Sequence, residues 1–195
     1  MNPLRIARRR LPVIIGFSFL FAIMGIGCSL MAPQYSASLE NVQKLKDAGD
    51  YTAKVGEFGS KQDPANANPI SLRGSSLSSP YEGSYASYLA EAIKQELALA
   101  GKLSSGAHVE VSGVLLKNDI HAAGFSMAYG DIEARFVVKK GGQVRYDQVK
   151  SIHYEWESSF AGSIAIPRAQ QEYPGLVQKL LATLYVDLSF LQALK

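Results

Sequence analysis

The N-terminal segment constrains this chain more than any other stretch of its sequence. Four of its first ten residues are arginines, it contains no acidic residue, and it continues as an apolar run from Leu11 to Gly27. The only cysteine of the chain, Cys28, follows that run directly. A basic segment, an apolar segment and small residues before a cleavage point are typical of a secretion signal. We therefore expect the folded part of the chain to begin after this segment.

The segment Gly25–Cys28 resembles the lipobox of bacterial lipoproteins, in which a signal peptidase cuts before a cysteine that carries diacylglycerol. Ile26 and Gly27 fit that pattern, whereas Gly25 stands where the family usually has leucine. The resemblance implies that residues 1–27 are a lipoprotein signal peptide and that Cys28 is the lipidation site. It also implies that the protein incorporates palmitate. Ser29 follows the cysteine. Because an aspartate there favours retention in the inner membrane of Gram-negative bacteria, serine implies anchoring in the outer membrane, on its periplasmic face.

The same stretch leaves an alternative open. The run from Leu11 to Met31 has only three polar side chains, so it is long enough to span a membrane as an uncleaved helix. Gly25, Gly27 and Pro33 favour the lipoprotein, since glycine and proline make a poor end to a spanning helix. In both cases the arginines stay in the cytoplasm, and the rest of the chain is tethered beyond the inner membrane.

Removal of the signal changes the charge of the chain. The full chain has 20 basic and 17 acidic residues, a net charge of +3. Without the four arginines of residues 1–27, 16 basic and 17 acidic residues remain, a net charge of −1. No basic patch for nucleic acid is therefore expected. The remaining 168 residues suit a short tether, residues 28–37, and one periplasmic domain, residues 38–195, held together by packing without a disulfide.

The first half of the domain reads as a helix, a strand and a second helix. Ser38–Gly49 has a serine cap, two apolar residues on one face and a glycine stop. Thr52–Phe58 alternates well enough for a strand. A polar loop, Gly59–Asn68, and a short extended piece, Ile70–Arg73, come next. Ser79–Gly101 predicts a helix that begins with a capping box and a proline at its first position.

Three strands are expected in the second half: His108–Lys117, Met127–Lys139 and Val144–Trp156. Adjacent glycines after Lys140 predict a tight hairpin between the last two. Gln148 and Lys150 interrupt the apolar face of the third strand, which predicts a bulge there. The middle strand alternates most clearly, and its predicted core residues are Ala128, Ile132, Ala134, Phe136 and Val138.

A long connection, Ser158–Gln171, is expected to lead to a closing helix that begins at Pro174, followed by a helical tail from Asp187. The order is therefore β-α-β-β-β-α. It predicts an α/β fold of the α+β type: one mixed or mainly antiparallel four-stranded sheet packed by two helices, with a right-handed β-α-β unit at its start.

This element order behind a lipidated cysteine resembles small periplasmic lipoproteins of the YajG type and the lipopolysaccharide-assembly lipoprotein LptE, over about residues 52 to 186. The shared features include a strand that ends in Gly56-Glu57-Phe58 before a polar loop, and an amphipathic helix that ends in glycine. Related arrangements occur in lipoproteins attached to lipid-transport machines. The resemblance implies a fold and an address, and it leaves the activity open.

Residue patterns for chemistry are sparse. His108, His121 and His153 lie far apart in the sequence and match no metal-ligand spacing, so we expect no metal and no cofactor. Gly124–Ala128 approximates the nucleophile elbow of serine hydrolases, with Asp147 and His153 following in the order of that fold. The elbow needs a helix after the serine, however, and here a strand follows. A serine hydrolase is therefore the third reading, and we expect no enzyme.

The predicted topology brings three connections to one end of the sheet: Gly59–Ser78, Asn118–Ser126 and Ser158–Gln171. They carry apolar residues that are unusual in exposed loops, namely Ile120, Phe125, Phe160, Ile164 and Ile166. Clustered exposed apolar residues mark a binding surface. The alternative is that they fold back and plug the open end of the core.

The sequence thus predicts a non-enzymatic outer-membrane lipoprotein that binds another envelope component as an assembly or transport-accessory factor. An envelope protein is the expected partner. The alternative is a periplasmic lipid or glycolipid carrier, which needs a cavity between the sheet and the helices.

Overall fold

The computed structural model describes residues 29–195. The predicted signal peptide, residues 1–27, and Cys28 lie outside the described residues. No helix among residues 29–195 is long and apolar enough to cross a membrane.

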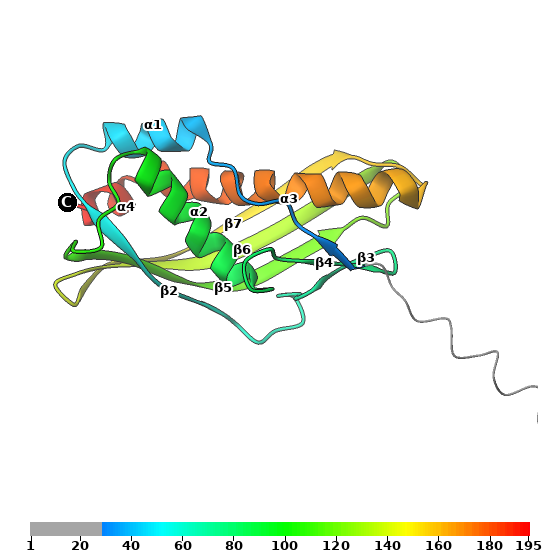
Figure 1. Cartoon of the computed structure of the whole chain (residues 1–195), viewed down its shortest axis with the longest axis horizontal. Helices are drawn as coiled ribbons and strands as arrows, with labels where there is room; N and C mark the ends of the chain where they lie inside the picture. The colour runs from blue at the N-terminus through cyan, green and yellow to red at the C-terminus, as the bar shows by residue number, and fades with distance from the viewer. Residues whose placement is uncertain (1–28) are drawn as a thin grey trace, which may run out of the picture.

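The fold is the predicted α+β arrangement, built on a four-stranded sheet. Its order is β2 (Ala53–Ser60), β5 (Val109–His121), β6 (Met127–Lys140) and β7 (Gln143–Glu157). As the β-α-β prediction requires, β2 runs parallel to β5, and the other neighbours are antiparallel. Figure 1 shows the helices on one face of this sheet. They are α1 (Leu39–Asp47), α2 (Tyr85–Leu99), α3 (Gly162–Tyr185) and α4 (Leu188–Ala193).

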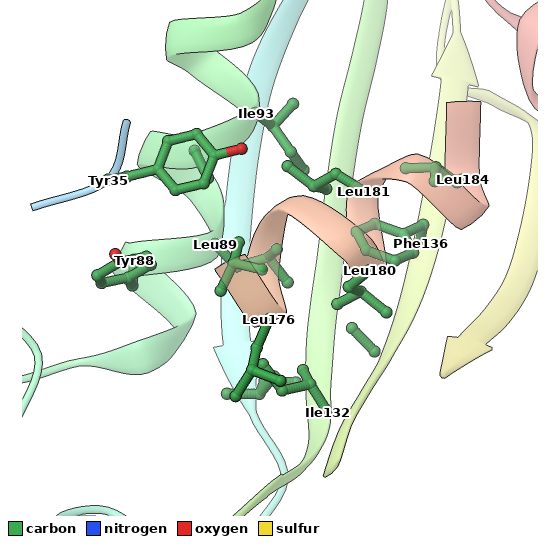
Figure 2. Packing of buried hydrophobic residues seen from close by; sticks show 14 of the residues in the cluster. Tyr35, Tyr88, Leu89, Ile93, Ile132, Phe136, Leu176, Leu180, Leu181 and Leu184 are labelled. Atoms are coloured by element: carbon green, nitrogen blue, oxygen red, sulfur yellow. The ribbon is translucent and has the colours of Figure 1, made fainter. Parts of the chain in front are cut away.

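The core lies between the sheet and the helices, in the register predicted for β6. Its five predicted core residues are each at most 2% exposed. The apolar stripe of α3 covers them, and Figure 2 shows Phe136 and Ile132 of β6 against Leu176 and Leu180 of α3. Alternation at steps of two on the strand and of three or four on the helix accounts for this match.

The sequence did not predict the bulge in β2, and it misplaced the bulge in β7. In β2 a register shift between Val55 and Phe58 turns both side chains toward the core, although their spacing alone would separate them. In β7 the bulge predicted at Gln148 and Lys150 is wrong, because the shift lies nearer the hairpin, opposite Val138 and Lys139. Lys150 stays on the inner face, where its ammonium lies 2.7 Å from Asp187 at the start of α4.

The starts of two helices also differ from the prediction. Ser84 caps α2, not Ser79, because Glu82 and Gly83 adopt positive φ and end the preceding turn. The predicted helix start at Pro174 is wrong as well, since α3 begins at Gly162 and contains Pro174. A proline removes one helical hydrogen bond, but the buried stripe continues through Ala165, Ala169 and Tyr173, and burying it outweighs that loss. Most of the expected connection Ser158–Gln171 is therefore helix.

A second, three-stranded sheet was not predicted. Its order is β1 (Ser29–Met31), β4 (Ser75–Ser78) and β3 (Ile70–Leu72), with β1 parallel to β4. The described part of the expected tether is thus folded onto the domain. Tyr35 is buried, and its hydroxyl donates a hydrogen bond of 2.6 Å to Glu96 of α2.

Candidate interaction surface

The tip of the β3–β4 hairpin meets two further connections at one end of the domain. The guanidinium of Arg73 donates hydrogen bonds to the backbone carbonyls of Ala122, Gly124 and Phe160, the last two over 2.6 and 2.7 Å. A further bond of 2.7 Å runs from the amide of Ser158 to the carbonyl of Ser126. One side chain therefore holds together the β5–β6 loop and the β7–α3 loop.

The turn itself places Arg73 in this position. Arg73 and Gly74 form a two-residue connection with φ of 50° and 85°. Positive φ at both central residues is the conformation that suits a tight hairpin, and glycine adopts it without strain. Because the turn is short, its first residue projects from the end of the hairpin toward the neighbouring loops.

The two loops present a stacked pair of phenylalanines to solvent. The rings of Phe125 and Phe160 lie 5.1 Å apart with an angle of 12° between their planes. The two residues are nevertheless 77% and 70% exposed. No other phenylalanine, tyrosine or tryptophan among residues 29–195 is as exposed to solvent. Most of the two rings therefore faces away from the protein.

The predicted surface residues divide into three groups. Phe125, Phe160 and Ile164 are exposed at this end, as predicted. Ile166 is partly buried and packs against the core. Ile120 is only 3% exposed, so its place on the surface was wrong. The strand β5 extends past Lys117, and a register shift between Leu115 and Lys117 turns Ile120 inward.

Two exposed methionines did not stand out in the sequence, and one of them, Met127, lies at the same end. Met127 begins β6 beside the β5–β6 loop, and Met31 ends β1. The backbone carbonyl of Met31 accepts a hydrogen bond of 2.7 Å from Gln170 of α3. We call the exposed residues Phe125, Met127, Phe160 and Ile164 the apolar end.

A polar cluster lies on the open face of the sheet. His121 and His153, far apart in the sequence, pack on either side of Tyr129 with ring centroids 4.5 and 5.0 Å away. The Nδ1 atom of His153 lies 2.7 Å from Asp131, and this hydrogen bond, followed by one to Glu155, raises the pKa of His153. Within residues 29–195 no group of three or more histidine, cysteine, aspartate or glutamate residues is arranged to hold a metal ion.

The residues considered for a hydrolase do not meet. Asp147 accepts a hydrogen bond of 2.6 Å from Arg135, whereas His153 is held by Asp131. His153 lies six positions after Asp147 along β7, which corresponds to about 20 Å. Ser126 precedes β6, whose first residue Met127 pairs with Glu157. The carboxylate therefore cannot orient the imidazole, and the imidazole cannot reach the serine in the way a catalytic triad requires.

The space between the sheet and the helices is filled by the buried side chains described above. An open groove of about 590 Å³ lies instead at the edge of the sheet, between β2 and α2, and polar side chains such as Glu91 and Lys94 contribute to its lining. A lipid carrier needs an enclosed apolar cavity. The groove therefore lies on the surface of the domain, outside the core.

Sequence comparisons identify no relative: no family model matches the chain, and no curated protein matches it. Among solved structures, protein XCC0632 from Xanthomonas campestris, of family DUF330, superposes with a TM-score of 0.51 at 10% identity, covering 81% of this chain and 89% of its own. This likeness is one of fold.

Two further solved structures resemble the chain more weakly, each at 10% identity. The "hypothetical protein CT253" from Chlamydia trachomatis has a TM-score of 0.45, and the match covers 74% of this chain and 99% of its own. A "putative lipoprotein" from Caulobacter crescentus CB15 has a TM-score of 0.46, with coverage of 79% and 96%.

Sequence reasoning found both phenylalanines but missed Arg73, which holds their loops. The available signal was Gly74, since glycine adopts the positive φ that a tight turn needs, directly after the short piece Ile70–Leu72. It was overlooked because the serine-rich strand β4 does not alternate between apolar and polar residues.

Proposed function

We propose that this protein is a lipid-anchored cell-envelope protein that acts by non-covalent binding, and that the apolar end is its binding surface. The observation that carries the proposal is the stacked, exposed pair Phe125 and Phe160. Two largely exposed phenyl rings are unfavourable in water, and clusters of this kind mark interaction sites. Aromatic residues also dominate the energy of many interfaces.

The bracing by Arg73 supports the same conclusion. Both loops are fixed through their backbone carbonyls, so the phenyl rings are presented before any partner binds. Binding then orders fewer groups, which favours affinity. An assembly or transport-accessory role needs such a surface and needs no catalytic group.

The anchor is the second part of the proposal. Lipidation of Cys28, after cleavage at the lipobox-like segment, attaches the domain to the periplasmic face of the outer membrane. The YajG/LptE-like resemblance supports this address. The folded residues that follow Cys28 are consistent with cleavage, since Ser29–Met31 form β1 and are not available to extend a spanning helix.

Complementation of a deletion strain tests the binding surface. Phe125→Ser and Phe160→Ser are expected to abolish function while the midpoint of urea unfolding stays nearly unchanged. Leu188→Ser is the matched control, because Leu188 is 71% exposed on α4 at the opposite end of the domain (Figure 1). Full complementation by both phenylalanine variants would place the site elsewhere. Unfolding of either variant would mean that the rings stabilise the fold.

A further inference from the structure

Ser29, the residue that directly follows Cys28 in the sequence, lies near the apolar end in the structure. The first residue of β1, Ser29, pairs with Ser76 of β4. Ser76 is three residues from Arg73, so their Cα atoms are at most about 10 Å apart. Arg73 in turn contacts the carbonyl of Phe160. Figure 1 shows β1, the β3–β4 hairpin and the start of α3 at the same end of the domain.

There is almost no free chain between the anchor and the fold. Cys28 precedes Ser29 directly, and consecutive Cα atoms are about 3.8 Å apart. A lipid on Cys28 therefore holds Ser29, and the hairpin beside it, at the membrane surface. An uncleaved apolar helix ending near Cys28 would hold them there too.

The segment after Ser29 is hydrogen-bonded to the domain and does not act as a flexible linker. The amide of Ala32 donates to Ser78 over 2.8 Å, and the hydroxyl of Tyr88 donates to the carbonyl of Pro33 over 2.9 Å. The hydroxyl of Tyr35 is bonded to Glu96. The domain can thus turn about its anchor only at the bonds beside Cys28, which keeps the end that carries β1 within reach of the bilayer.

We infer that the apolar end docks into the lipid bilayer that holds the anchor. This inference rests on the proposed function and deepens it by naming lipid, not a protein, as what the surface binds. Phenylalanine, isoleucine and methionine side chains gain free energy when they enter the boundary between headgroups and acyl chains. A guanidinium beside them can also interact with lipid phosphates, since Arg73 has five N–H donors and three are bonded to carbonyls.

The anchor makes weak insertion sufficient. A surface that is covalently held at the membrane meets lipid at a high effective concentration, so a few side chains can keep it inserted without strong affinity of their own. Insertion at this end would hold the domain in one orientation relative to the membrane. The opposite end, which carries α4, would then point into the periplasm.

Depth-dependent quenching tests the inference on the full, lipidated protein in vesicles. Phe125→Cys, Phe160→Cys and Leu188→Cys are each labelled with the environment-sensitive fluorophore NBD; a lipidated Cys28 has no free thiol to react. The vesicles contain phosphatidylethanolamine and phosphatidylglycerol, with or without lipids that carry a nitroxide on the acyl chain. The nitroxide is expected to lower emission about twofold or more at positions 125 and 160, and by less than about a tenth at position 188.

Equal quenching at all three positions, or none at 125 and 160, would overturn the inference. Because the vesicles contain no other protein, quenching reports contact with lipid alone, and complementation in cells tests the proposed function separately. Absent quenching, combined with loss of complementation by Phe125→Ser and a protein crosslink from position 125 in cells, would leave a binding surface but assign it to a protein. Urea unfolding of each labelled variant confirms that it is folded.

Discussion

The guanidinium of Arg73 donates a hydrogen bond of 2.7 Å to the carbonyl oxygen of Phe160, which lies 87 residues further along the chain. The bond goes to the backbone, so it fixes the loop while the phenyl ring of the same residue remains free to face outward. A charged side chain thereby serves to present an apolar one.

Replacement of Arg73 should loosen both loops together. Arg73→Ala removes three hydrogen bonds from a charged donor and is expected to cost about 1–3 kcal/mol of unfolding free energy, measured in urea. Hydrogen exchange at the amide of Ser158, which bonds to Ser126, should accelerate. Arg73→Lys should lie between wild type and alanine, because an ammonium lacks the planar fork of donors. Unchanged exchange in Arg73→Ala would show that the loops hold without it.

The register of β6 predicts opposite results for adjacent residues. Phe136 is completely buried, so Phe136→Ala should cost about 3–5 kcal/mol in urea unfolding. Arg135 lies on the open face and pairs with Asp147 of β7, and loss of this exposed pair should cost less than about 1 kcal/mol. Equal losses at the two positions would contradict the register.

Strand positions were predictable where alternation is unbroken and failed where a bulge intervenes. Along β6 every second residue is apolar, so its inner face could be read directly from the sequence. Along β5 the shift after Leu115 reverses the faces, which is why Ile120 lies in the core and not on the surface. A bulge depends on the partner strand, and a local pattern carries little information about it.

Long-range polar contacts could not be predicted at all. Arg73 and the two loops are brought together by the second sheet, whose strands β1 and β4 are short, β4 being serine-rich as well. The start of α3 was misplaced for a local reason, since Pro174 is typical of a helix start but here lies inside a continuous buried stripe. The exposed phenylalanines could be predicted because apolar residues in a loop are unusual, whatever the register of the neighbouring strands.

Lipidation at Cys28 can be tested independently of the fold. Cys28→Ala should abolish incorporation of labelled palmitate and leave an uncleaved precursor tethered in the inner membrane. Metabolic labelling and fractionation of intact cells measure both effects. Label that persists on the alanine variant would exclude the lipoprotein, and wild-type protein found in the inner membrane would contradict the address implied by Ser29.

Glu96 should make the stability of the domain depend on pH. Its side chain is completely buried on α2, where one oxygen, Oε1, accepts hydrogen bonds from the Tyr35 hydroxyl, the Ser38 amide and the Asn41 side chain. The other oxygen, Oε2, has no partner among the described residues. Burial raises the pKa of this carboxyl above its ordinary value of 4.5, and the three donors together with the neighbouring Tyr185 hydroxyl only partly offset that effect.

The sign of the pH effect follows from proton binding. Between pH 4.5 and the raised pKa, the folded protein holds a proton that the unfolded chain has lost. The stability from Glu96 is therefore fully present below about pH 4.5 and is lost as the pH rises through the folded value. Urea unfolding from pH 4.5 to 8 should show a decline for wild type that is smaller in Glu96→Gln, where any remaining slope includes the raised pKa of His153.

Glu157→Gln is the matched control, since it removes an exposed carboxylate of β7, and its slope should equal that of wild type. Ionisation of Glu96 should also affect the stability of the N-terminal segment, because Tyr35 and Ser38 both donate hydrogen bonds to Glu96. A neutral amide in Glu96→Gln keeps an acceptor for both donors without a buried charge. Identical slopes in wild type and Glu96→Gln would mean that folding leaves the pKa of Glu96 unchanged, and would contradict this prediction.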